Sequence, residues 1–189
     1  MKIFLFTTLL VFSTANYSQS GESIIYHTNG KISEKFATIA KNQVIMNGVT
    51  IDYNDFKRIE ITDKNKNNKI VYEYVYLENK KRPFLMEVIF EGNKAKLYSR
   101  KAFIYRNENT NIGGTLNSEE YGHYGKKVDD KYVVEISLEG TNAIYGNKFK
   151  KKGVEFFSDC PELSTLIKSK KIKNKDKIKA FDYYEKECN

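Results

Sequence analysis

Short runs of alternating hydrophobic and polar residues occupy the first part of the chain, from Ser23 to about Arg106. Turn residues separate these runs, and Asn-Gly pairs stand at positions 29–30 and 47–48. An Asn-Gly pair between two such runs is typical of a tight β-hairpin, because both residues tolerate positive φ. The pattern therefore predicts a small antiparallel meander or barrel, with strands at 24–28, 36–46, 49–53 and 56–61.

Later segments extend this predicted sheet. Ile70–Leu77 is largely apolar on both faces, which predicts a central strand with a neighbour on each side. Phe84–Glu91 and Lys94–Tyr105 flank Gly92 and Asn93, and this arrangement predicts a β-hairpin. A late strand is expected at Lys131–Leu138, with one face made by Tyr132, Val134, Ile136 and Leu138.

The segment 107–130 has a different composition, rich in Asn, Gly, Ser, Glu and Lys. We interpret it as a long mobile loop within the β-rich part. Loops of this length inside compact domains are often either functional or disordered. We therefore take Tyr121, His123 and Tyr124 as candidate binding residues.

The end of the chain changes to helical spacing, with apolar residues recurring every three or four positions from Phe156 to Ile167. Asp159 and Glu162 resemble a capping box at the start of this helix. A second helix is expected from about Asn174 to Cys188, with Ile178 among its apolar positions. We expect the pair to pack on the β-rich body through Phe156, Leu163, Ile167, Phe181 and Tyr184.

Cys160 and Cys188 are the two cysteines of the chain. Two helices joined by a short turn run antiparallel, so the start of the first lies beside the end of the second. Cys160 and Cys188 occupy those two ends, and we expect a disulfide between them in an oxidising compartment. The rival interpretation is a reactive or metal-binding cysteine, for which His27 and His123 are the available histidines.

The first residues have the order of a secretory signal peptide: Lys2, then the apolar run Ile3–Phe12, then small and polar residues. We assign residues 1–20 to this signal, with cleavage either after Ala15 or nearer Ser20. The apolar run is about half the length that a membrane-spanning helix needs, so we expect no transmembrane anchor after processing. The mature chain is expected in the periplasm or the extracellular medium.

The net charge is +8, and loss of Lys2 leaves +7. A basic balance serves solubility or attracts an anionic partner. Arginine is scarce, which argues against a specific nucleic-acid partner, because bidentate phosphate and base contacts favour arginine over lysine. Lys168–Lys179 contains seven lysines and one acidic residue. Its members could hold the protein weakly to an anionic envelope surface or to another polyanion, and the candidates are Lys170, Lys171, Lys173 and Lys175.

Motifs for catalysis are lacking in the sequence. It contains no Gly-x-Ser-x-Gly elbow, no His-Glu-x-x-His and no phosphate-binding Gly-Lys-Ser/Thr loop. The acidic pairs Glu119-Glu120 and Asp129-Asp130 are typical of a solvated polar segment, although paired carboxylates can also perform hydrolysis. No catalytic residue, cofactor or metal site is predicted, and a small hydrolase using loop carboxylates or His123 stays open as an alternative.

A resemblance spans most of the mature chain. It rests on Phe84–Ile89 with Gly92, on Phe156–Leu163, and on Tyr183, Tyr184 and Cys188. These residues resemble a group of uncharacterised exported proteins of Gram-negative bacteria whose terminal helix pair carries one cysteine at each end. The resemblance implies the architecture and the compartment, and it implies no activity.

Together these features predict an α+β protein. An antiparallel β-rich domain covers 21–140, and a disulfide-linked helical hairpin within 141–189 packs on it. The expected function is non-catalytic: a binding or interaction module of the periplasm or cell envelope that takes a protein partner or a small ligand.

Overall fold

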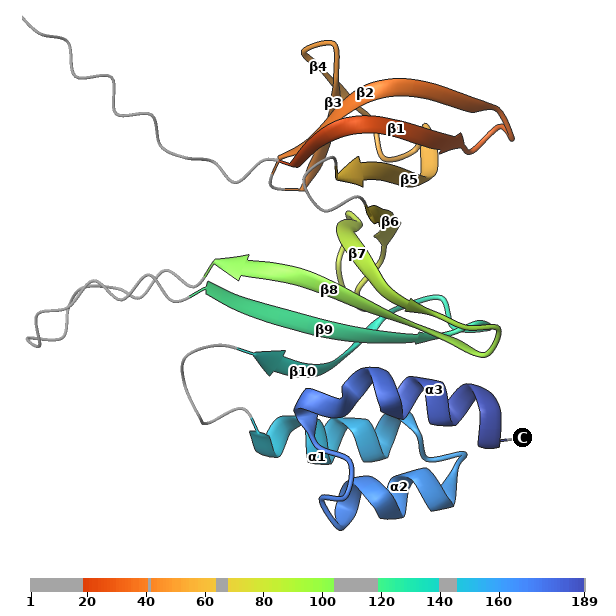
Figure 1. The fold of residues 1–189 in the computed structure, drawn as a ribbon, viewed down its shortest axis with the longest axis vertical. Coiled ribbons are helices and arrows are strands. Elements are labelled where there is room, and N and C mark those ends of the chain that lie inside the picture. Colours follow the sequence, from red (N-terminus) through yellow and green to blue (C-terminus); the bar gives the residue numbers. More distant parts are fainter. Residues whose placement is uncertain (1–18, 41, 64–67, 104–118, 140–145, 189) are drawn as a thin grey trace, which may run out of the picture.

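The computed structural model describes residues 19–40, 42–63, 68–103, 119–139 and 146–188 (Figure 1). Residues 1–18 of the expected signal, and residues 107–118 of the expected loop, lie outside this description. The fold class is α+β, with an antiparallel β-rich body and C-terminal helices, as predicted. The strands within the described ranges are β1 (Gln19–His27), β2 (Ile32–Ala40), β3 (Gln43–Met46), β4 (Val49–Ile51), β5 (Phe56–Asp63), β6 (Asn68–Val75), β7 (Phe84–Glu91), β8 (Ala95–Phe103), β9 (Glu119–Lys127) and β10 (Val134–Glu139).

These strands form one antiparallel sheet in the order β10-β9-β8-β7-β6-β5-β1-β2-β3-β4. The predicted turn chemistry is confirmed: Asn47 and Gly48 both have positive φ, 51° and 77°, between β3 and β4. The hairpin around Gly92 and Asn93 joins β7 to β8, and β6 lies between β5 and β7 as a central strand should. The segment expected as one strand at 36–46 instead turns at Asn42, forming β2 and β3.

The first part of the sheet, from β1 to β7, curls around its own hydrophobic core. Alternate residues of these strands face this core, because side chains on a strand point to opposite faces in turn. Asn42, in the turn between β2 and β3, ties the curl together. It donates to Pro83 O (3.3 Å) and accepts from Leu85 N (2.7 Å) and the Tyr74 hydroxyl (3.2 Å). The buried members of this core are Ile25, Ala37, Ile39, Val44, Met46, Phe56, Ile59, Ile61 and Leu85.

The second part of the sheet is covered by α1 (Gly146–Phe156), α2 (Pro161–Lys168) and α3 (Lys177–Glu187), with a 3-10 turn, η2 (Asn174–Asp176), before α3 (Figure 1). The helices pack on the same sheet face that forms the first core, now on β8–β10. Gly125 of β9 allows a close approach, since a Cβ there would lie 2.8 Å from the Phe156 ring. The expected packing residues are all buried in this second core, namely Phe156, Leu163, Ile167, Phe181 and Tyr184.

The helix expected to start near Asp159 and Pro161 is confirmed as α2, but Phe156, which the apolar spacing had joined to that helix, is the last residue of the separate helix α1. Cys160 precedes a proline and is extended, with φ −122° and ψ 86°, so the helix restarts at Pro161. Asp159 does not cap α2; its carboxylate accepts the Tyr184 hydroxyl at 2.6 Å and pairs with Lys127 at 2.8 Å. In α3, Ile178 points to solvent instead of into the core, and Lys177 is buried.

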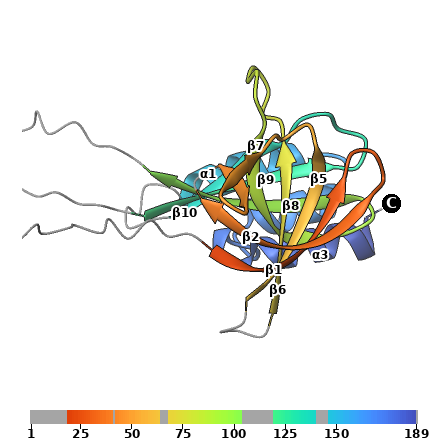
Figure 2. The same cartoon turned by 90° about the horizontal axis from the view of Figure 1, so that it is seen from above.

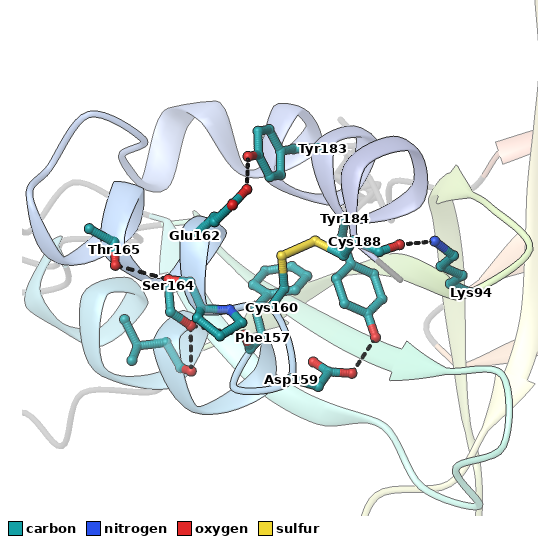
Figure 3. The surroundings of a disulfide bond; sticks show 12 residues. Lys94, Phe157, Asp159, Cys160, Glu162, Ser164, Thr165, Tyr183, Tyr184 and Cys188 are labelled. Carbon is teal, nitrogen blue, oxygen red and sulfur yellow. Dashed lines mark hydrogen bonds between the residues drawn. A yellow bond between two sulfur atoms is a disulfide. The ribbon is translucent and has the colours of Figure 1, made fainter.

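The predicted disulfide joins Cys160, before α2, to Cys188, after α3, with their Cα atoms 5.6 Å apart (Figure 3). Two further contacts fasten the end of α3 to the β7–β8 hairpin. The Glu185 carboxylate accepts the backbone N–H groups of Asn93 (2.8 Å) and Lys94 (2.9 Å), and Lys94 Nζ donates to Cys188 O. The disulfide thus closes a helical layer that is itself attached to the sheet.

Strand β10 differs from the expected pattern. Val134 is exposed, whereas Val133, Ile136 and Ser137 are buried. The register shifts between Glu135 and Ser137, because Ile136 is an extra residue in the ladder with β9. Such a bulge changes which side chains face the core, so strict alternation from Tyr132 to Leu138 fails.

Candidate functional site

A cleft of about 630 Å³ is lined mainly by residues on the sheet face opposite the two cores, together with Phe56 and Tyr74, which contact the first core. Strands β8 and β9 lie below β1 and β5 in the view of Figure 1, and Figure 2 shows the same strands from above. Residues from both levels line the cleft. The upper level contributes Tyr26 and Arg58, β6 contributes Glu73, and the lower level contributes Tyr98 and Lys126. The full lining is Tyr26, Thr28, Tyr53, Asn54, Phe56, Lys57, Arg58, Glu73, Tyr74, Val75, Tyr76, Pro83, Lys96, Tyr98 and Lys126.

Beta pairing brings the charged members of this face together. Arg58 of β5 lies opposite Glu73 of β6, and Glu91 of β7 lies opposite Lys96 of β8. Side chains directly opposite on neighbouring antiparallel strands are about 5 Å apart at Cβ. The alternation of the sheet therefore places acids and bases in a row across four strands.

These residues form a connected charge network. Arg58 Nη1 contacts Glu91 at 2.8 Å and Glu73 at 3.3 Å, and Arg58 Nε contacts Glu60 at 3.2 Å. Lys96 Nζ contacts Glu73 at 2.8 Å and Glu91 at 2.6 Å. Each cation thus bridges at least two carboxylates, which fixes the side chains more firmly than an isolated surface pair would.

The network keeps Arg58, Lys96 and Glu91 ionised. Partial burial opposes ionisation of Arg58, Lys96 and Glu91, but the hydrogen bonds and charges among them outweigh it. The pKa values of Arg58 and Lys96 are raised, and the pKa of Glu91 is lowered. These three groups therefore stay charged through the physiological pH range and do not supply a proton at neutral pH.

Tyr98 connects the network to an apolar floor. Its hydroxyl donates to Glu73 Oε2 at 2.9 Å, and burial, followed by the Glu73 charge, raises its pKa. Its ring belongs to a third buried cluster on the cleft side of the sheet. That cluster comprises Val75, Met86, Tyr98, Tyr124 and Val133. The cleft thus offers both an apolar surface and fixed charges.

The expected loop at 107–130 is corrected in its second part, because residues 119–127 form β9 between β8 and β10. Glycines and polar residues concealed the alternation there. Of the three candidates, Tyr121 is exposed, while His123 and Tyr124 are buried. Tyr124 belongs to the floor cluster, and His123 faces the helices, so the three do not share a surface.

The lysine candidates lie at the turn between α2 and α3. Lys170, Lys171, Lys173 and Lys175 are all exposed there. None of these four lysines lines the cleft.

His123 lies in a second polar cluster, where the sheet meets η2 and α3. It is 5% exposed and stands opposite Ser137 of β10 and Ser99 of β8. His123 Nε2 is 3.8 Å from a Glu139 oxygen, and Lys177 Nζ contacts the other oxygen of that carboxylate. A serine, a histidine and a carboxylate are therefore neighbours, but Ser137 is 0% exposed, which denies a substrate access to its hydroxyl.

This cluster makes stability depend on pH. Burial, and secondly the positive charge of Lys177, lower the pKa of His123 to about 4. The negative charge of Glu139 acts in the opposite direction but is outweighed. An unfolded histidine titrates near 6.5, so the unfolded chain binds more protons between those values. The contribution of neutral, buried His123 to the free energy of unfolding is fully present above pH about 6.5 and is lost as the pH falls toward 4. We expect a loss of about 3 kcal/mol at most.

Urea unfolding of the wild type and of His123→Gln between pH 7 and 4 measures this effect. The variant is expected to lose less stability than the wild type over that range. His27→Gln is the control, because His27 lies near the surface, bonded to Ser33 at 2.8 Å. Equal pH dependence in wild type and His123→Gln would contradict the assignment.

The sequence held a signal for the cleft that its interpretation missed. Glu73 interrupts the otherwise largely apolar run Ile70–Leu77, and Arg58 and Glu60 stand at alternate positions of β5. Charges at alternate positions indicate one polar face, but the pairing of β5 with β6 and of β7 with β8 was needed to place them together.

Comparison of the chain with protein-family models, with curated proteins and with solved structures finds no match. Among the residues that the structure describes, no three His, Cys, Asp or Glu side chains are grouped so that they could hold a metal ion. Within the same ranges, every helix is too short or too polar to cross a membrane.

Proposed function

We propose that the chain is an exported, non-catalytic binding protein that takes a small molecule in the cleft. The observation that carries the proposal is the cleft itself: about 630 Å³, with an apolar floor and fixed charges. Small-molecule sites commonly have volumes of about 300 to 1,000 Å³ and combine apolar walls with a few placed polar groups. Protein partners instead favour broad and flatter surfaces.

The charge network supports binding over catalysis. Glu73 and Glu91 are both engaged by Arg58 and Lys96, and the Tyr98 hydroxyl is engaged by Glu73. A general acid or base needs a pKa near the working pH, and a nucleophile needs a neighbouring base. The pKa values of Arg58, Lys96 and Glu91 are shifted away from neutral pH. These groups therefore keep their charges and suit the orientation of a ligand.

Export is part of the proposal. The disulfide between Cys160 and Cys188 supports export, because disulfides persist mainly in oxidising compartments outside the cytoplasm. We further propose that the signal peptide is cut after Ala15. Gln19 Oε1 accepts the Tyr72 hydroxyl at 2.5 Å, and Ser20 bonds Thr38 at 2.8 Å, both through β1. Cleavage nearer Ser20 would remove these contacts from the mature sheet.

Two tyrosines of similar exposure test the location of the site. Tyr76 lines the cleft and is 37% exposed, whereas Tyr121 is 40% exposed and lies on β9 outside the lining. We expect small molecules that raise the melting temperature of the wild type to bind Tyr76→Ala about tenfold more weakly, through loss of an aromatic contact. Tyr121→Ala should bind them unchanged.

The measurement is a thermal-shift screen followed by calorimetric titration of the hits against the three proteins. If Tyr121→Ala no longer binds the hits and Tyr76→Ala still does, the binding site lies on the surface of β9 and not in the cleft. Hits that both variants bind as tightly as the wild type would remove the cleft as the site.

A further inference from the structure

The lysines of the cleft point to the chemical class of its ligand. Lys126 of β9 lies directly opposite Lys96 of β8, and Lys96 lies opposite Glu91 of β7. Like charges directly opposite each other on neighbouring strands destabilise a sheet. Lys96 is compensated by Glu73 and Glu91, at 2.8 and 2.6 Å. Lys126 adds a second positive charge beside an already saturated group.

Within the described residues, Lys126 and Lys57 have no ion-pair partner. Both lysines line the cleft. Lys57 lies at the irregularity in the ladder between β1 and β5, where Tyr26 pairs with Arg58 and His27 with Phe56. The cleft lining therefore contains four cations, Lys57, Arg58, Lys96 and Lys126, and one carboxylate, Glu73.

The carboxylate of the lining does not compensate the two free lysines. Glu73 Oε1 is held by Arg58 and Lys96, and Glu73 Oε2 accepts the Tyr98 hydroxyl. A cleft with low-dielectric walls and an excess of one charge concentrates ligands of the opposite charge. Tyrosine rings beside these cations provide an apolar surface for the rest of such a ligand.

We propose that the ligand is a small organic anion with a ring or other apolar body, whose anionic group is held by Lys126 and Lys57. This inference rests on the proposed function and names the ligand class of the same cleft. The apolar body lies on the tyrosine rings of the lining, and the anionic group lies between Lys57 of β5 and Lys126 of β9. Lys126 then gains the counter-charge that the described residues do not supply.

A pair of matched fluorescent probes tests this assignment. 8-Anilino-1-naphthalenesulfonate carries a sulfonate, and N-phenyl-1-naphthylamine has a closely similar ring system without it. Both are titrated into the exported protein, into the Lys57→Gln/Lys126→Gln double variant, and into a Lys170→Gln/Lys171→Gln control. The control removes the same charge at the exposed helical turn.

We expect the double variant to bind the sulfonate probe about fivefold more weakly, as two partly exposed ion pairs would give. The neutral probe should bind all three proteins equally, and the control should match the wild type with both probes. Displacement of the sulfonate probe by benzoate or by phenyl phosphate then distinguishes a carboxylate from a phosphate ligand.

The failures of the two proposals are distinguishable. If both probes bind and are weakened by Tyr76→Ala, but the double lysine variant binds the sulfonate probe like the wild type, the anionic ligand is overturned and the cleft remains. If neither probe binds the wild type, the small-molecule cleft itself is overturned, and the anionic assignment falls with it.

Discussion

Phe181→Ala is expected to lower the free energy of unfolding by about 4 kcal/mol, the range typical for truncation of a buried phenylalanine. Phe181 is 0% exposed and lies at the centre of the helical layer. Its ring centroid is 5.9 Å from that of Phe90, 5.5 Å from Phe156 and 5.1 Å from Phe157. Truncation would remove all three ring contacts and leave a cavity between the helices and the sheet.

Ile178→Ala is the matched control on the same helix. Ile178 is 50% exposed, so its truncation should change the free energy of unfolding by no more than about 0.5 kcal/mol. Urea denaturation of both variants measures the difference. A larger loss for Ile178→Ala than for Phe181→Ala would show that the helix packs through its other face.

Replacement of both disulfide cysteines, Cys160→Ser with Cys188→Ser, is expected to cost about 3 to 4 kcal/mol. The disulfide closes a loop of sequence separation 28, and a cross-link of that size restricts the unfolded chain by about this amount. For a chain of this length the loss corresponds to a melting temperature lower by about 10 °C.

The same proteins provide the test and its control. Thermal unfolding of the wild type with and without a thiol reductant should reproduce the difference between wild type and double variant. The double variant itself should not respond to the reductant. A melting temperature unchanged by either treatment would contradict a stabilising disulfide and leave the Glu185 and Lys94 contacts as the attachment of α3.

The parts of the fold that could be predicted are those set by local chemistry. The Asn-Gly pairs located the β1–β2 and β3–β4 turns, where Gly30 and Gly48 have positive φ, because few residues other than Asn and Gly suit such turns. The helical spacing of Phe181 and Tyr184 located α3. The missed helix, α1, has Phe149, Gly153 and Phe156 on one side, but a glycine in the middle lowers helix propensity. Its stability comes from packing against β10 and α2, which the sequence pattern does not contain.

The candidate site was less predictable, for a physical reason. The cleft depends on which strands are neighbours, and β1 inserts between β5 and β2, out of chain order. Glu73 could be recognised as a charge within an apolar strand, yet its partners Arg58 and Lys96 lie 15 and 23 positions away in the chain. The glycines of β9 concealed a central strand, so His123 was expected in a loop and is instead buried beneath the helices.

The central claim is that the exported chain holds a small molecule, and a native mass spectrum of the protein from the cells that make it tests this most directly. The account predicts a chain that begins at Asn16, is lighter than its reduced form by two hydrogen atoms, and carries a small anionic molecule that is released on unfolding. A spectrum showing only the bare chain, or the chain bound to a protein subunit, would contradict it.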